Sequence, residues 1–205
     1  MTPHGATLDR IIEHCWSRLA TSVGTPGDAM RSGVFTTRLG EGVTSRTVVI
    51  RTVDAAHRLV TFNTDYRTAK ANELTRHPHV AWLFYDAQAG TQIRLRGQGE
   101  LVRDPERTEP HWQSLPAPSY RSFLTARAPS TPTDAWAIDV NAHLLVPQPV
   151  FTEADIEAAR SNFAVVETTI DHVDWVWLAP DGTVRNARAQ FSWNGTNWDG
   201  TWVVP

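Results

Sequence analysis

Arg46-Thr-Val-Val-Ile-Arg51 is a run of β-branched residues between two arginines, and this composition predicts a strand. Phe62-Asn-Thr-Asp-Tyr-Arg-Thr-Ala-Lys70 predicts a second strand that leads into a basic helix start, and Gln92-Ile-Arg-Leu-Arg-Gly97 predicts a third strand that carries a polar amide. Backbone N–H groups at a helix start bind phosphates, and here they lie beside Arg67 and Lys70. We therefore expect the three segments to converge on one anion.

An ideal strand places the two arginines of the first segment on opposite faces. Arg46 shares a face with Val48, whereas Arg51 shares the other face with Val49. Both arginines can contact one ligand only if the ligand wraps around the strand edge, or if the strand twists or bulges between them. Two solvated surface arginines remain the alternative interpretation.

The segments on either side predict a mainly β protein, a β-barrel with peripheral helices. Apolar residues at three- and four-residue spacing predict an amphipathic helix over residues 7–21, and Asp65 is a plausible cap for a short helix over residues 66–76. Gly97 and Gly99 indicate a bend in one barrel strand. The expected strands are residues 34–39, 43–53, 59–63, 80–85, 91–102, 163–170, 173–178, 184–193 and 198–204.

A proline-rich segment interrupts the strands. Eight of the 13 prolines lie between residues 104 and 149, so we expect short helices around 105–114 and 119–127, joined by irregular chain. Thr152 is expected to cap a further helix that ends near Ser161. The sequence therefore predicts one domain over residues 1–205, with a helical insertion at about residues 104–160.

Composition limits the possible partners. The chain has 205 residues and a net charge of −3, which gives no electrostatic reason to expect nucleic acid or an anionic membrane. The chain contains no 18-residue apolar stretch, and its first residues do not resemble a secretion signal. Its one cysteine, Cys15, excludes an intrachain disulfide and lies on the apolar stripe of the first helix as a buried, inert thiol. We expect a cytoplasmic protein that binds a small molecule.

Other chemical motifs are weak. His77-Pro-His79 and Asp171-His-x-Asp174 lack further ligands at a metal-binding spacing, so no metal is expected. The chain has no P-loop, no Rossmann glycine pattern and no Gly-x-Ser-x-Gly motif for a nucleophilic serine. No catalytic residue is assigned.

Taken together, the central segments resemble the pyridoxamine 5′-phosphate oxidase family of FMN-binding split barrels, in a divergent branch. The resembling motifs occur in the family's order and at nearly its spacing over residues 33–102, and a weaker likeness covers residues 163–205. The motifs are Arg46-Thr-Val-Val-Ile-Arg51, Phe62-Asn-Thr-Asp65, Lys70, Arg76-His-Pro78 and Gln92 before Gly97, followed by the ending Trp202-Val-Val-Pro205.

The resemblance implies a site for FMN and a site for substrate. Ala69 stands where the family usually has an arginine beside the phosphate lysine, and Arg67 is expected to compensate from one turn away. Either Trp175 or Trp177, with Trp177 preferred, is expected to reach the flavin from a second subunit. The implied cofactor-binding residues are Arg46, Val48, Val49, Asn63, Thr64, Arg67, Lys70, Gln92 and Trp177, and the implied substrate-binding residues are Arg51, Ser119 and Arg188.

The resemblance further implies an FMN-dependent oxidoreductase that is a homodimer with FMN at its interface and a small-molecule substrate. The substrate pocket is expected to differ from that of the oxidase, because Arg51 replaces a lysine and Leu115 stands where an arginine is expected. A non-catalytic flavin or haem binding protein on the same barrel is the alternative, since a fold does not determine a function.

Overall fold

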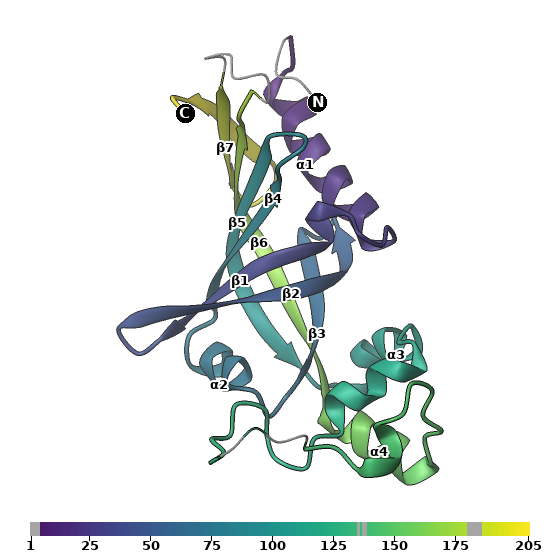
Figure 1. Ribbon diagram of the computed structural model, residues 1–205. Helices are drawn as coiled ribbons and strands as arrows, with labels where there is room; N and C mark the ends of the chain where they lie inside the picture. The colour runs from purple at the N-terminus through teal and green to yellow at the C-terminus, as the bar shows by residue number, and fades with distance from the viewer. Residues whose placement is uncertain (1–4, 135, 137–138, 180–185) are drawn as a thin grey trace.

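The computed structural model describes residues 5–134, 136, 139–179 and 186–205. Its sheet has the strand order β3-β2-β1-β4-β5-β6-β7-β8, and an additional pairing of β3 with β6 closes β1 to β6 into a barrel (Figure 1). All of these neighbouring strands pair antiparallel. The strands are β1 (Ser32–Leu39), β2 (Gly42–Asp54), β3 (Leu59–Asp65), β4 (His79–Asp86), β5 (Thr91–Val102), β6 (Phe163–Trp177), β7 (Ala187–Trp193) and β8 (Trp198–Val203).

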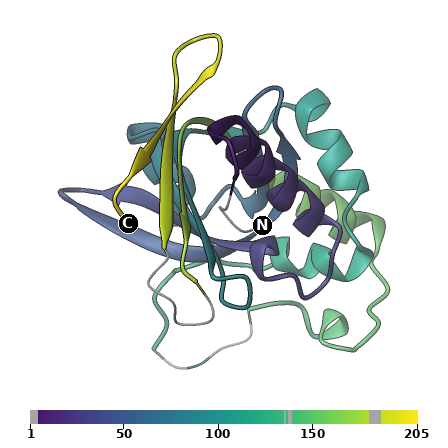
Figure 2. The same cartoon turned by 90° about the horizontal axis from the view of Figure 1, so that it is seen from above.

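The barrel encloses an aromatic core. Phe35, Phe62 and Trp82 pack against one another with ring centroids 4.8–5.5 Å apart, and Trp175 is completely buried beside them. Helix α1 (Leu8–Val23) lies along the barrel and buries one apolar stripe, including Cys15, against this core (Figure 2). The mainly β barrel with peripheral helices is thus confirmed. No helix in the described residues is long and apolar enough to cross a membrane.

The last barrel strand is longer than the sequence predicts. Residues 163–170 and 173–178 were expected as two strands, but β6 is continuous from Phe163 to Trp177. Arg96 pairs with His172 and Gly97 pairs with Ile170, so Asp171 is an extra residue in β6 and forms a bulge. The bulge interrupts the alternation of side chains without ending the strand. Within the expected strand 184–193, residues 184–185 lie outside the described residues.

The helical insertion has a second apolar cluster of its own. It contains α3 (Pro105–Gln113), a 3-10 helix (Ala117–Phe123) and α4 (Glu153–Asn162). The capping box of Thr152 and Asp155 begins α4 at the expected place. The buried residues of this cluster are Val102, Trp112, Leu115, Phe123, Ala159, Phe163 and Val165. Because the last two belong to β6, the insertion is packed against the outside of the barrel wall.

Candidate flavin and substrate site

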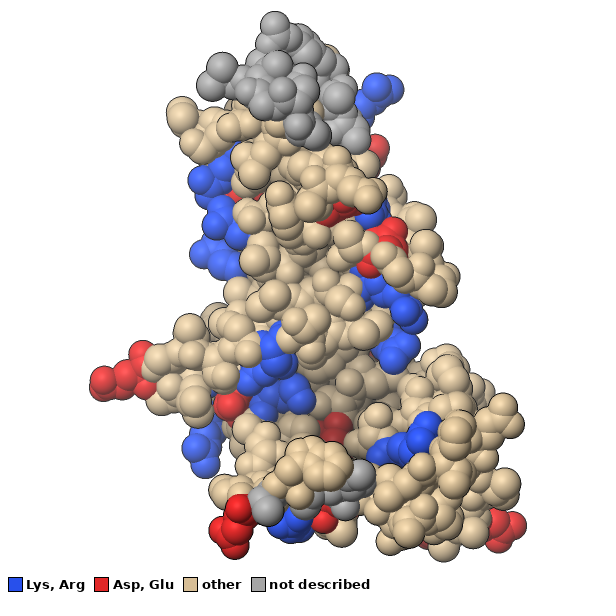
Figure 3. Space-filling model, in the orientation of Figure 1, with Lys and Arg blue, Asp and Glu red and all other residues tan. Residues whose placement is uncertain are grey.

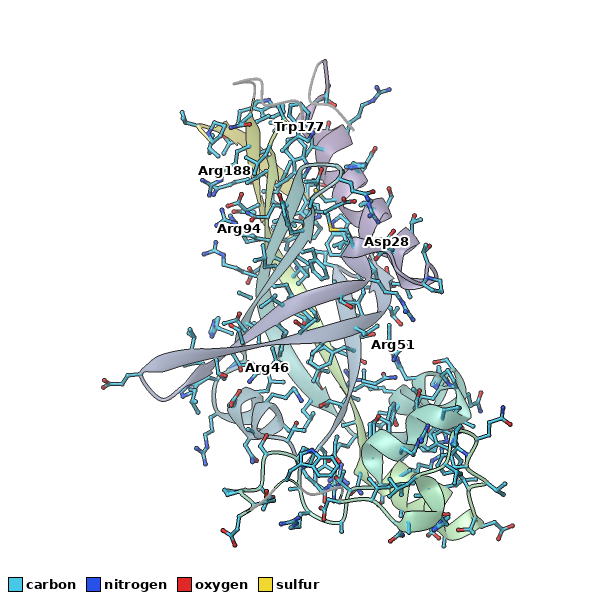
Figure 4. The ribbon with its side chains drawn as sticks, viewed as in Figure 1. Asp28, Arg46, Arg51, Arg94, Trp177 and Arg188 are labelled. Atoms are coloured by element: carbon cyan, nitrogen blue, oxygen red, sulfur yellow. The ribbon has the colours of Figure 1, made fainter. Side chains whose placement is uncertain are left out.

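A cavity of about 290 Å³ lies between the β2–β3 wall of the barrel and the helical insertion. Figure 3 shows a recess between these two parts of the surface, and Figure 4 shows Arg51 at its upper edge. Five residues that the sequence assigned to the site meet here, namely Arg51, Asn63, Thr64, Lys70 and Ser119. The other lining residues are Asp65, Thr68, Leu115, Ser122, Phe123 and Pro129.

Arg51 reaches the cavity from a β-bulge. Ile50 pairs with Phe62 and Thr52 pairs with Thr61, so Arg51 has no partner residue in β3. Arg46 pairs with Phe35, which faces the barrel core, and Arg46 is not among the cavity-lining residues. The strand bulges at Arg51 and not between the two arginines, and the two side chains lie in different surroundings.

Arg46 is held by protein partners. Its Nη2 donates to Glu73 Oε2 at 2.9 Å, and its Nη1 donates to Thr37 Oγ1 at 2.5 Å. The Glu73 side chain is only 7% exposed, so this ion pair is well shielded from water. The sequence did not point to Glu73, although its position one turn after Lys70 on α2 (Ala69–Arg76) could have done so.

Lys70, the only lysine in the chain, is placed differently. Its Nζ donates to Thr64 Oγ1 at 3.0 Å, and within the described residues no carboxylate forms a salt bridge with it. Burial lowers the pKa of Lys70, and the positive charge of Arg46 lowers this pKa further, against smaller opposing effects of Asp65 and Glu73. An anion beside Lys70 would stabilise its charged form and so raise its pKa again.

The helix start beside Lys70 differs from the expected one. The N-cap of α2 is Thr68 and not Asp65, and the Thr68 side chain donates to the Asp65 carbonyl oxygen instead of capping the helix. Asp65 accepts from the Arg67 guanidinium at 2.6 Å, and Arg67 also donates to the Thr125 carbonyl oxygen at 3.0 Å. Arg67 thus connects β3 to the insertion, and most of its N–H donors are engaged. Its role as a substitute at Ala69 remains a prediction.

Several buried polar atoms of cavity-lining residues have no hydrogen-bond partner among the residues that the structure describes. Arg51 Nε and both amide atoms of Asn63 are buried and make no hydrogen bond within the described residues. Burial lowers the pKa of Arg51, and the positive charge of Arg31 contributes. Buried polar groups of native proteins normally have partners, because leaving one unpaired costs about 1–3 kcal/mol. The donor and acceptor set of this cavity therefore fits an anionic ligand that also offers neutral polar atoms.

The remaining predicted residues lie elsewhere in the single chain. Val48 packs against the barrel core and pairs with Gly33, and Val49 pairs with Ser32. Gln92 is half-buried and pairs with the exposed Tyr85 on the outer face of β5. None of these three lines the cavity. Their contacts with a flavin remain predictions.

The two candidate tryptophans belong to the core side of β6. Trp175 is completely buried, whereas Trp177 is partly exposed and packs against the same core cluster. Trp177 is therefore the one of the pair whose ring reaches the surface. Figure 4 shows it far from Arg46 and Arg51 within one chain.

Arg188 belongs to a charged cluster on the outer face of β5, β6 and β7, which the sequence did not reveal. Asp174 is buried and accepts from Arg188 at 2.7 and 3.0 Å, from Arg94 at 2.5 Å and from Gln190 at 2.9 Å. Burial raises the pKa of Asp174, but these hydrogen bonds and charges outweigh burial and the net pKa is lowered. Arg94 and Arg188 lie side by side in Figure 4, in a cleft of about 580 Å³ that is separate from the cavity.

A larger groove of about 680 Å³ lies between α2 and the β5–β6 wall, and Arg58, Leu74, Gln98 and Asp171 are among its lining residues. None of the predicted site residues borders it. In the described part of the chain, no three His, Cys, Asp or Glu side chains are grouped closely enough to hold a metal ion.

Part of the chain is similar to known proteins. Residues 34–103 match the family model described as pyridoxamine 5′-phosphate oxidase, FMN-binding domain. A pyridoxine/pyridoxamine 5′-phosphate oxidase of Janthinobacterium sp. (strain Marseille) is 32% identical over 95 residues, which are 46% of this chain and 44% of the relative. The same type of enzyme from Mycolicibacterium paratuberculosis is 38% identical over 72 residues, which are 35% of this chain and 31% of the relative. The match thus spans less than half the length of these curated relatives.

Solved structures resemble the chain over nearly its whole length. A pyridoxamine 5′-phosphate oxidase-related, FMN binding protein from Nostoc punctiforme superposes with a TM-score of 0.72 at 22% identity, covering 98% of both chains. PhzG from Burkholderia lata 383, in complex with tetrahydrophenazine-1-carboxylic acid, gives a TM-score of 0.67 at 15% identity and covers 100% of this chain and 98% of PhzG. At these identities the likeness establishes the fold. The expected resemblance is confirmed: residues 34–103 match a pyridoxamine 5′-phosphate oxidase-type FMN-binding domain, and the chain has the FMN-binding split-barrel fold.

Proposed function

We propose that the protein is a flavoprotein that binds FMN in the cavity between β2–β3 and the insertion, and that it is an oxidoreductase. The observation that carries this proposal is a set of three polar side chains around the cavity: Lys70, whose charge has no carboxylate partner within the described residues, and Arg51 and Asn63, which have buried atoms without a hydrogen bond. These groups fit a ligand with an anionic phosphate and neutral polar ring atoms, and the matched FMN-binding domain contributes all three.

Lys70, Thr64 and the start of α2 are the groups that would hold the phosphate. Lys70 would supply a half-buried positive charge, Thr64 would position its Nζ, and the first turn of α2 would supply backbone N–H donors. Arg46 is close enough to lower the pKa of Lys70, and Glu73 compensates its charge. We propose that Arg46 belongs to the same phosphate site, where its guanidinium would be shared between Glu73 and the phosphate.

FMN supplies the redox chemistry when it is bound, because a flavin can accept and return a hydride. The chain's own residues would bind the cofactor and the substrate, orient them and shield them from water. Phe123, Leu115 and Pro129 exclude water from one side of the cavity, and Arg51 and Ser119 provide polar contacts for a substrate. Leu115 is buried in this wall, where the related oxidases are expected to have an arginine, so the substrate is proposed to differ from pyridoxamine 5′-phosphate.

The site is proposed to be completed by a second copy of the chain. Arg188 and Trp177 lie away from Arg51 in Figure 4, and Gln92, on the outer face of β5, does not line the cavity. One chain therefore does not bring them to its own cavity. A homodimer with two equivalent sites would place them against the flavin of the partner subunit.

The absorption spectrum of the purified protein, before and after anaerobic addition of reduced nicotinamide or dithionite, tests the proposal. We expect a flavin spectrum that bleaches on reduction and returns when oxygen or another acceptor is added. A Soret band, or a flavin that no reductant bleaches, would instead support the non-catalytic alternative.

A further inference from the structure

Glu73 is a buried carboxylate one turn after Lys70 on α2, and it joins three elements of the fold. Its Oε2 accepts from Arg46 Nη2 at 2.9 Å and from Thr37 Oγ1 at 2.5 Å. Thr37 Oγ1 in turn accepts from Arg46 Nη1 at 2.5 Å, so the three side chains form a closed triangle between β1, β2 and α2. Figure 1 shows α2 below the β1–β2 hairpin, and Figure 4 places Arg46 just above α2.

The triangle is shielded from water, because Glu73 and Thr37 are both buried. A carboxylate in such surroundings is costly unless a cation compensates its charge. Arg46 is the cation with which Glu73 forms an ion pair within the described residues. The negative charge of Glu73 is therefore matched to the positive charge of Arg46.

The same carboxylate acts on Lys70, which lines the cavity. Burial lowers the pKa of Lys70 most and Arg46 lowers it further, whereas Asp65 and Glu73 oppose this shift. Asp65 is itself bound by Arg67. Arg46, Lys70 and Glu73 thus interact as one group, in which two positive charges and one negative charge leave a single net positive charge.

A negative charge at this place opposes the binding of an anion. A phosphate held by Lys70 and Arg46 would be attracted by both cations and repelled by Glu73, and repulsion between like charges is strong in partly buried surroundings. Carboxylate and phosphate also offer a guanidinium the same kind of acceptor oxygen. Glu73 and a phosphate would therefore compete for Arg46.

We propose that Glu73 is an internal competitor of the FMN phosphate, which neutralises Arg46 until FMN binds and whose charge limits the affinity of the site. This inference rests on the proposed function and names what regulates the same site. Glu73 does not line the cavity, so it is a positioning residue that acts through Arg46 and Lys70. An ion pair with a purely structural role would instead support the fold equally with and without FMN.

Glu73→Gln tests the proposal, because glutamine keeps an acceptor oxygen for Arg46 and Thr37 and removes only the charge. FMN and riboflavin are titrated by fluorescence into both proteins at low salt, after bound flavin has been dialysed away. We expect the variant to bind FMN about ten-fold more tightly than the unchanged protein does. Riboflavin, which lacks the phosphate, should bind equally to both.

Thermal unfolding gives a second measurement on the same variant. Without FMN its melting temperature should fall, because Arg46 and Lys70 then repel each other without compensation. Saturation with FMN should raise the melting temperature of the variant more than that of the unchanged protein, since a tighter ligand stabilises more. An equal rise in both proteins would contradict the proposal.

Glu13→Gln is the matched control. Glu13 is an exposed residue of α1 whose side chain makes no hydrogen bond or ion pair within the described residues. The substitution changes the net charge of the protein by the same amount as Glu73→Gln. It should leave the affinity for FMN unchanged.

Unchanged or weaker FMN binding by a folded Glu73→Gln protein would overturn the inference, as would an equal gain for riboflavin. If this variant does not fold, Glu73→Asp takes its place, because aspartate withdraws the charge from Arg46 by one methylene. It should still tighten FMN binding, and unchanged affinity would overturn the inference in the same way.

Inorganic phosphate, titrated into the same proteins, separates the two proposals. Failure of the unchanged protein to bind FMN would refute the proposed function. Tighter binding of inorganic phosphate to the Glu73→Gln protein would still support the competitor role of Glu73, and equal binding would refute it.

Discussion

At the scale of single residues, Lys70 offers the sharpest test of the phosphate site, because no other lysine exists in the chain. Replacing it with alanine removes one charge-assisted contact and should weaken FMN binding by about 1.5–3 kcal/mol, roughly ten- to a hundred-fold. Fluorescence titration measures the affinity, and circular dichroism checks the fold. A variant with normal dichroism and unchanged FMN affinity would remove Lys70 from the site.

Leu115, in the apolar side of the cavity, gives a second prediction for a single residue. Leu115 is 7% exposed and lines the cavity, so it offers no charge to the phosphate of pyridoxamine 5′-phosphate. Losing the arginine expected at position 115 removes one charge-assisted contact to a desolvated phosphate, which costs several kcal/mol. We expect kcat/KM for pyridoxamine 5′-phosphate below about 10⁴ M⁻¹s⁻¹, the low end of ordinary enzymes. Oxygen uptake measures it, and a higher value would show that the pocket accepts this substrate.

At the scale of elements, the close approach of β5 to β6 beside the bulge depends on one glycine. A Cβ at Gly97 would overlap the backbone carbonyl of Thr169, whereas a Cβ at Gly99 would meet the flexible side chain of Leu74. We expect Gly97→Ala to lower the free energy of unfolding by about 3 kcal/mol and Gly99→Ala by about 1 kcal/mol. Urea unfolding of both variants compares them. Equal losses would mean that β5 and β6 can separate at the bulge without cost.

The elements also show which parts of the fold can be predicted from the sequence. Runs such as Arg46–Arg51 predicted the barrel strands, because β-branched residues favour the half-buried pleated surface of a sheet. The continuity of β6 was missed because a bulge at Asp171 breaks the alternation that marks a strand. The motif between Asn63 and Lys70 predicted much of the cavity lining from local spacing alone. The partners of Asp174 depend on the register of β5, β6 and β7, which local patterns do not encode.

At the scale of the whole molecule, the separation of Lys70 from Arg188 and Trp177 is the reason why we propose a homodimer. Leu83 and Tyr85, which are 37% and 48% exposed, add apolar surface on the outer face of β4 near the Asp174 cluster. We expect light scattering to give about twice the 22.9 kDa mass of one chain. Full FMN occupancy at the mass of one chain would refute the shared site.

The central claim is that FMN is the cofactor of this split barrel. The cationic groups suit one phosphate, and the sequence lacks the glycine pattern that binds the pyrophosphate of FAD. The most direct measurement is mass spectrometry of the small molecules released when the natively purified protein is denatured. The account predicts FMN at up to one molecule per chain. Recovery of FAD, haem or a deazaflavin without FMN would contradict it.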